Sequence, residues 1–121
     1  MNSVRTSLII RCLHQDAARI RSQARSEHRS LSGYLLYVLE RSMWIEDKIA
    51  RGLSASLLLT QARLMKIERL GQVRTAVHLY CTVEEAARIR ESAGRRQMSI
   101  SDFVVFSLRR SWGAIKRLQL G

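Results

Sequence analysis

Arg5-Thr6-Ser7-Leu8-Ile9-Ile10-Arg11-Cys12 returns 69 residues later as Arg74-Thr75-Ala76-Val77-His78-Leu79-Tyr80-Cys81. The alignment continues without a gap, and residues 5–43 and 74–112 share 14 identical positions. Average residue usage would give roughly 2–3 identities by chance over such a length. A unit this small buries too little apolar surface to fold alone, so we expect the two copies to complete one core together.

Each repeat begins with a segment that alternates between apolar and more polar residues. This period of two predicts a strand with one buried face. The buried rows are predicted to be Leu8, Ile10 and Cys12 in the first copy, and Val77, Leu79 and Cys81 in the second. The opposite faces carry Ser7, Ile9 and Arg11, and Ala76, His78 and Tyr80.

A first helix is predicted after each strand, with a narrow stripe of small apolar residues: Ala17, Ile20 and Ala24, and Ala86, Ile89 and Ala93. In the second repeat, Thr82 and Glu85 have the spacing of a capping box. In the first repeat Leu13 replaces the threonine, although Asp16 keeps an acid in the first turn, where the helix dipole favours it. Gly94 is predicted to form the turn after this helix in the second repeat.

A second helix is predicted to start at Ser30-Leu31-Ser32 and at Ser99-Ile100-Ser101, because serine is a favourable N-cap residue. These helices carry broad apolar faces that should supply most of the core. The first face comprises Leu31, Tyr34, Leu35, Val38 and Leu39, and the second Ile100, Phe103, Val104 and Leu108.

Residues 44–73 connect the repeats within a single domain that spans residues 1–121. Gly52 and Ser54 indicate a break, and residues 55–70 are predicted to be helical before Gly71. Residues 113–121 form a basic tail that extends the last helix. The fold class is therefore mainly α, with two short strands.

The net charge of +11 and the pI near 11.2 indicate a polyanionic partner, with nucleic acid ahead of an anionic membrane surface. The alternative is a generic solvated basic surface. No apolar run approaches the ~20 residues that cross a bilayer, and no signal peptide is apparent. We therefore expect a cytoplasmic protein with reduced thiols.

Enzyme chemistry finds little support in the sequence. His14, His28 and His78 lack metal-ligand spacing, and the two cysteines do not form a C-x-x-C pair. There is no glycine-rich phosphate loop. We expect neither catalysis nor a metal or other cofactor.

Two copies of strand, helix and helix, each with a polar outer strand face and a serine-rich start to the second helix, resemble the ribbon-helix-helix family of MetJ and Arc type. The resemblance covers residues 5–43 and 74–112. It implies that the two strands pair antiparallel and enter the major groove of DNA. Here one chain would carry both halves, as an intramolecular pseudo-dimer that is a monomer. The tandem, basic form is similar to the VirC-operon DNA-binding proteins of plant-tumour-inducing Ti plasmids, which support T-DNA transfer, and to plasmid mobilisation accessory proteins.

The resemblance makes the outward strand residues the candidates for base reading: Ser7, Ile9, Arg11, His78 and Tyr80. Arginine can donate two hydrogen bonds to guanine, and isoleucine suits a thymine methyl group. The alternative is that Ile9, His78 and Tyr80 pack beneath the connecting helix. The candidates for phosphate contacts lie at strand starts and helix N-termini: Arg5, Arg74, Ser30, Ser32, Ser99 and Ser101.

The two reading strands differ, so a non-palindromic DNA site is expected. If the strands pair about Ile9 and His78, Cys12 and Cys81 lie six residues apart along the ribbon. That is roughly 20 Å, beyond the reach of a disulfide.

Two other functions remain open at this point. The chain could be a transcriptional repressor, or a protein-interaction module that docks a partner ATPase or relaxase and uses its charge without sequence preference. Membrane-surface binding is disfavoured, because the helices have core-like faces.

Overall fold

The computed structural model describes residues 4–52 and 74–120. Their elements follow the predicted order: β1 (Arg5–Leu13), α1 (His14–Ser26), α2 (Leu31–Gly52), β2 (Arg74–Thr82), α4 (Val83–Arg95) and α5 (Ile100–Leu120). The fold is mainly helical with a two-stranded antiparallel sheet, as predicted. The helix predicted at residues 55–70 lies outside the described residues.

The two strands pair along their whole length, with Ile9 opposite His78 at the centre. The predicted alternation is confirmed. One face of the ribbon is buried, and it consists of Leu8, Ile10, Cys12, Val77, Leu79 and Cys81. A one-residue slip would turn this whole row to solvent, so the buried face fixes the register.

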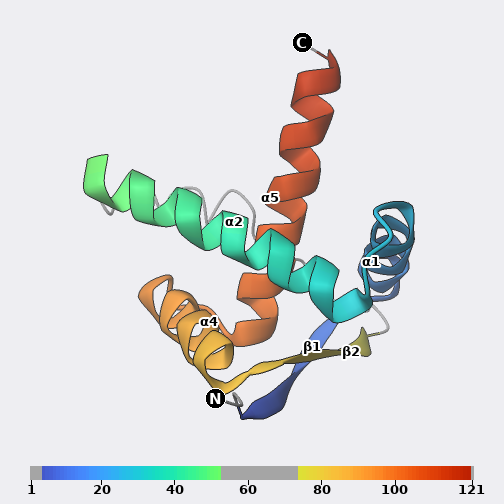
Figure 1. Cartoon of the computed structure of the whole chain (residues 1–121). Coiled ribbons are helices and arrows are strands. Elements are labelled where there is room, and N and C mark those ends of the chain that lie inside the picture. The colour runs from blue at the N-terminus through green and yellow to red at the C-terminus, as the bar shows by residue number, and fades with distance from the viewer. Residues whose placement is uncertain (1–3, 53–73, 121) are drawn as a thin grey trace.

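The helices lie on the buried side of the ribbon, with α1 and α4 at opposite ends and α2 crossing α5 between them (Figure 1). Each repeat reaches over the other, because α5 packs on β1 and α2 packs on β2. The buried side chains of both repeats form one hydrophobic cluster. The two units therefore make a pseudo-dimer within one chain.

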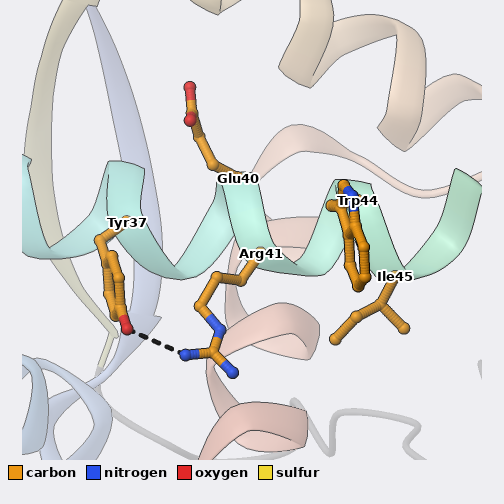
Figure 2. Close-up of a pocket in the computed structure, with 5 residues that line it drawn as sticks. All are labelled: Tyr37, Glu40, Arg41, Trp44 and Ile45. Carbon is orange, nitrogen blue, oxygen red and sulfur yellow. Dashed lines mark hydrogen bonds between the residues drawn. The ribbon is translucent and has the colours of Figure 1, made fainter.

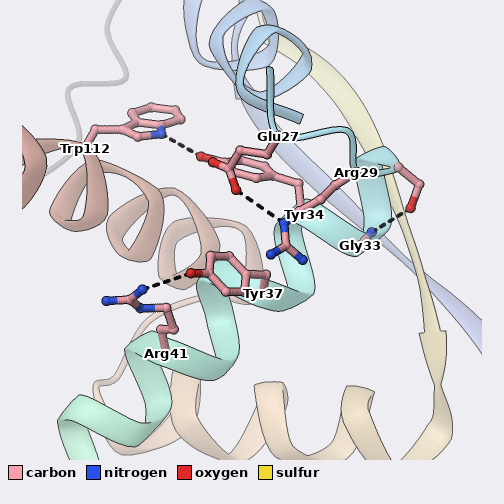
Figure 3. Close-up of polar contacts among 8 residues, drawn as sticks. Glu27, Arg29, Gly33, Tyr34, Tyr37, Arg41 and Trp112 are labelled. Atoms are coloured by element: carbon pink, nitrogen blue, oxygen red, sulfur yellow. Dashed lines mark hydrogen bonds and ion pairs between the residues drawn. The ribbon is translucent and has the colours of Figure 1, made fainter. Parts of the chain in front are cut away.

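The predicted apolar faces of α2 and α5 supply the largest part of the core. Leu35, Leu39, Phe103, Val104 and Leu108 have no measurable exposure, whereas Leu31 and Ile100 are only partly buried. Trp112 closes one side of the core, and its indole N–H donates to the Tyr34 hydroxyl at 2.9 Å (Figure 3). The stripes of α1 and α4 are buried too, and their small side chains bring these helices close to the ribbon.

The helix starts differ between the repeats as expected. The Thr82 hydroxyl accepts from the Glu85 N–H at 3.1 Å, and the Glu85 carboxylate accepts from the Thr82 N–H at 2.8 Å. Leu13 provides no side-chain cap at the start of α1. Asp16 is instead buried and accepts from Arg109 of α5 at 2.8 Å. The acid at this position thus joins the two repeats rather than capping its own helix.

The prediction that Gly94 forms the turn after α4 is wrong. Gly94 lies inside α4, and the left-handed residue is Gln97, with φ 58°; its counterpart in the first repeat is His28, with φ 55°. The N–H of the residue that follows each of them donates to a carbonyl five residues back, from Arg29 to Ala24 and from Met98 to Ala93. This is the Schellman ending, which glycine favours but other residues can adopt.

Cys12 and Cys81 are free and buried. Cys12 lies opposite Thr75 and Cys81 opposite Thr6, so six residues separate them along the ribbon, as predicted. Burial raises the pKa of both thiols, and neighbouring carboxylates raise the pKa further. Both cysteines therefore act as small core residues.

Candidate nucleic-acid interface

The outer face of the ribbon is open to solvent and carries all five of the predicted base-reading side chains. Ser7, Ile9, Arg11, His78 and Tyr80 are exposed. Exposure reaches 50% for Ile9 and 57% for Tyr80, although both are large and apolar. Large apolar side chains that gather on one exposed face can mark a contact site.

The register places unlike side chains at the two ends of this face. Arg11 lies opposite Ala76 at one end, and Ser7 lies opposite Tyr80 at the other. The centre pairs Ile9 with His78. The His78 and Tyr80 rings are stacked, with their centres 6.3 Å apart and 19° between their planes, so they form one aromatic pair on β2. A half-turn about the centre therefore exchanges Arg11 with Tyr80, and the surface is not symmetric.

Two of the predicted phosphate-binding serines hold the edges of the ribbon. Ser32, in the first turn of α2, accepts from the Tyr80 N–H at 2.9 Å. Ser101, in the first turn of α5, accepts from the Arg11 N–H at 2.9 Å and donates to the Ile9 carbonyl at 3.4 Å. Because each serine bonds the strand of the other repeat, we call this pair of contacts the serine clasp.

The other two serines are helix N-caps. The Ser30 hydroxyl accepts from the Gly33 N–H at 3.0 Å (Figure 3), and the Ser99 hydroxyl accepts from the Asp102 N–H at 3.1 Å. A Cβ at position 33 would lie 2.9 Å from the Ser30 hydroxyl, so a larger residue there would require that side chain to shift. The N-termini of both helices thus lie beside the ribbon edges, and their N–H dipoles favour anions there.

The two predicted arginines start the strands. Arg5 is exposed opposite Thr82, and its guanidinium donates to the Tyr80 carbonyl at 3.5 Å. Arg74 begins β2, with its backbone opposite Leu13. The two residues therefore lie at opposite ends of the ribbon, and phosphate binding by either one stays a prediction.

The sequence missed the serine clasp. From the sequence, these serines are predicted to face a ligand, since they lie at helix N-termini. That position carries no information about a strand 48 or 90 residues away, so the bonds to Tyr80 and Arg11 were not predicted. The equivalence of Ser32 with Ser101 and of Arg11 with Tyr80 across the repeat was the available signal.

Within residues 4–52 and 74–120, no three His, Cys, Asp or Glu side chains gather as metal ligands would. No helix in the described part of the chain has the length and apolar character needed to cross a membrane.

The arrangement of two strand-helix-helix units with paired strands is consistent with a tandem ribbon-helix-helix fold. No protein-family model, curated protein or solved structure matches the chain.

Proposed function

We propose that this protein binds double-stranded DNA by placing the β1–β2 ribbon in the major groove. The observation that carries the proposal is the exposed outer face of the ribbon, which presents a cation, a hydroxyl, an aliphatic and two aromatic side chains together. The major groove is about 12 Å wide and admits a two-stranded ribbon, and each base pair presents a distinct pattern there.

The roles of the side chains follow from their chemistry. Arg11 donates to O6 and N7 of guanine, Ile9 contacts a thymine methyl group, and Ser7 donates to or accepts from a base edge. His78 and Tyr80 reach bases or phosphates on the other half of the site. Arg5 and the N-termini of α2 and α5 hold the phosphates on either side, which fixes the register of the protein on the duplex.

The unlike ends of the ribbon predict a site without twofold symmetry. One half of the site faces Arg11 and Ala76, and the other faces Ser7 and Tyr80. Selection from random duplexes should yield one non-palindromic sequence with a guanine opposite Arg11. Two equivalent inverted half-sites for each protein molecule would contradict the proposal.

Two substitutions distinguish recognition of the base sequence from nonspecific attraction between the positive protein and DNA. Arg11→Ala should relax the base preference at one position of the selected site, by about 1–3 kcal/mol of discrimination. Arg90→Ala removes the same charge from the exposed surface of α4 and should weaken binding to all duplexes equally. If both variants change only overall affinity, the chain is a polyanion binder that does not read sequence.

We further propose that the protein is an accessory factor in the processing and transfer of plasmid DNA or T-DNA. The support is the resemblance of the tandem, basic chain to accessory proteins of that kind. A plasmid carrying the selected site should be mobilised more often in cells that contain the protein, and Arg11→Ala should remove the difference. Lowered transcription beside the site, with mobilisation unchanged, would instead indicate a repressor.

A further inference from the structure

An unusual surface follows one side of α2, beyond the serine clasp. Tyr37, Arg41, Trp44 and Lys48 stand at intervals of four, three and four residues, which places them in one row along the helix. We call this row the aromatic-basic stripe. Exposure is 62% for Trp44 and 36% for Tyr37. Tryptophan is highly buried on average, so the open Trp44 indole in one row with the Tyr37 ring is an exposed aromatic surface of the kind that interaction sites present.

Cations lie against both rings of the stripe. The Arg29 guanidinium lies 4.0 Å from the centre of the Tyr37 ring, and Arg41 donates to the Tyr37 hydroxyl at 2.9 Å (Figure 3). The Lys48 ammonium lies 5.4 Å from the centre of a Trp44 ring. Flat apolar rings and positive charges therefore alternate along about 16 Å of helix.

The acids of α2 whose side chains are described each pair with an arginine of α4. Glu40 pairs with Arg88 of α4 at 3.6 Å, and Asp47 pairs with Arg95 of α4 at 3.7 Å. Figure 2 shows Glu40 pointing away from the side on which Tyr37 and Arg41 lie. These exposed ion pairs contribute little stability, but they leave positive charge in excess on the stripe.

The stripe borders a hollow and belongs to one repeat only. Tyr37, Glu40, Arg41, Trp44 and Ile45 line an open depression of about 550 Å³ (Figure 2). At the equivalent positions of the second repeat, Phe106 is fully buried and Gly113 replaces Trp44. The pseudo-dimer fold therefore does not require an aromatic residue at position 44.

We propose that the aromatic-basic stripe binds single-stranded nucleic acid, at a site separate from the ribbon. One base stacks on the open Trp44 indole, and another replaces the Arg29 guanidinium over the Tyr37 ring. Arg41 and Lys48 neutralise the neighbouring phosphates, which is how single strands are bound without sequence reading. Tyr37 and Trp44 are seven residues apart, about 10 Å, and this spans about three stacked-base steps of 3.4 Å. In a duplex the base faces are already stacked on one another, so these rings select unpaired bases.

Two other occupants are possible for such a row, and they differ in what they require. An acidic peptide needs the charges of Arg41 and Lys48 but no flat ring. A second copy of the chain would cover Trp44 but would itself bring a strongly positive surface, given the net charge of +11. The positive charges and the exposed aromatic rings together match the phosphates and unpaired bases of a single-stranded nucleic acid best.

Fluorescence anisotropy of a labelled oligothymidylate, measured beside a labelled duplex, tests the proposal. Trp44→Ala should weaken binding of the single strand by about tenfold or more and change duplex binding less than about twofold. Because Trp44 is exposed, this variant should keep the melting temperature of the parent. Arg11→Ala on the ribbon should give the opposite pattern, so failure of the ribbon proposal and failure of this one are separate results.

The intrinsic fluorescence of the protein provides a second readout. The other tryptophan, Trp112, is only 6% exposed, so quenching by the oligothymidylate should report Trp44 and should disappear in Trp44→Ala. The proposal is overturned if Trp44→Ala weakens the binding of duplex and single strand equally, or if it weakens the binding of neither. It is also overturned if polyglutamate of matched charge displaces the single strand at equal concentration, or if sedimentation shows that Trp44→Ala dissociates a dimer.

Discussion

The serine clasp makes a quantitative prediction about how the two repeats are held together. Ser32→Ala removes the acceptor for the Tyr80 N–H, and Ser101→Ala removes the acceptor for the Arg11 N–H. A net hydrogen bond contributes about 0.5–1.5 kcal/mol. Since both strand edges are exposed, water can replace the lost serine, and we expect a loss of about 0.5–1 kcal/mol in the free energy of unfolding for each variant.

The two halves of the clasp should be independent. Arg11 lies opposite Ala76, which is four residues from Tyr80 along β2, so the two bonds are about 13 Å apart. Effects at this separation add within about 0.3–0.5 kcal/mol. The double variant should therefore lose about 1–2 kcal/mol, read as a lower urea midpoint with an unchanged slope.

A serine-to-alanine change inside a helix also raises helix propensity, so the measurement needs a control. Ser22→Ala, at an exposed position of α1, reports that gain alone and should leave stability unchanged or slightly higher. If the clasp variants behave like Ser22→Ala, the cross-repeat bonds contribute nothing and the reasoning is refuted. A fall in the slope would mean that the variants change the compactness of the folded or unfolded state, or that unfolding is no longer two-state.

Three smaller predictions follow from the local structure. Gly94→Ala should raise the free energy of unfolding by about 0.5–1 kcal/mol, because the residue is helical and a Cβ there meets nothing within 4 Å; a lower urea midpoint would contradict this. Thr82→Ala should cost about 1 kcal/mol by removing the cap on the Glu85 N–H, whereas Thr82→Ser should retain most of it, both measured by urea unfolding. The free energy of unfolding should fall as pH rises past 9.0, the ordinary pKa of a cysteine thiol. Burial raises the pKa of Cys12 and Cys81 in the folded protein, so above this pH the unfolded chain loses protons that the folded protein keeps. A double replacement of both cysteines by alanine should remove that part of the pH dependence.

The repeat and the alternation determined most of the fold. Leu8, Ile10 and Cys12 could be assigned to the core because residues two apart share one face of a strand, whatever lies above them. Thr82 and Glu85 formed the predicted capping box because their interaction spans only three residues. Gly94 was misplaced because a Schellman turn can use another residue, here Gln97, when the surrounding structure holds it at positive φ.

The candidate sites divide in the same way. The sequence by itself determined which side chains share the outer face of the ribbon, because strand periodicity is local: Ser7, Ile9 and Arg11 alternate with buried residues wherever the strand lies. Only the tertiary structure decided what lies beside them. The bond from Ser101 to Arg11 and the exposure of Trp44 both depend on how α2 and α5 cross above the ribbon. Those relations join residues far apart in the chain, and local patterns of hydrophobicity and spacing do not encode them.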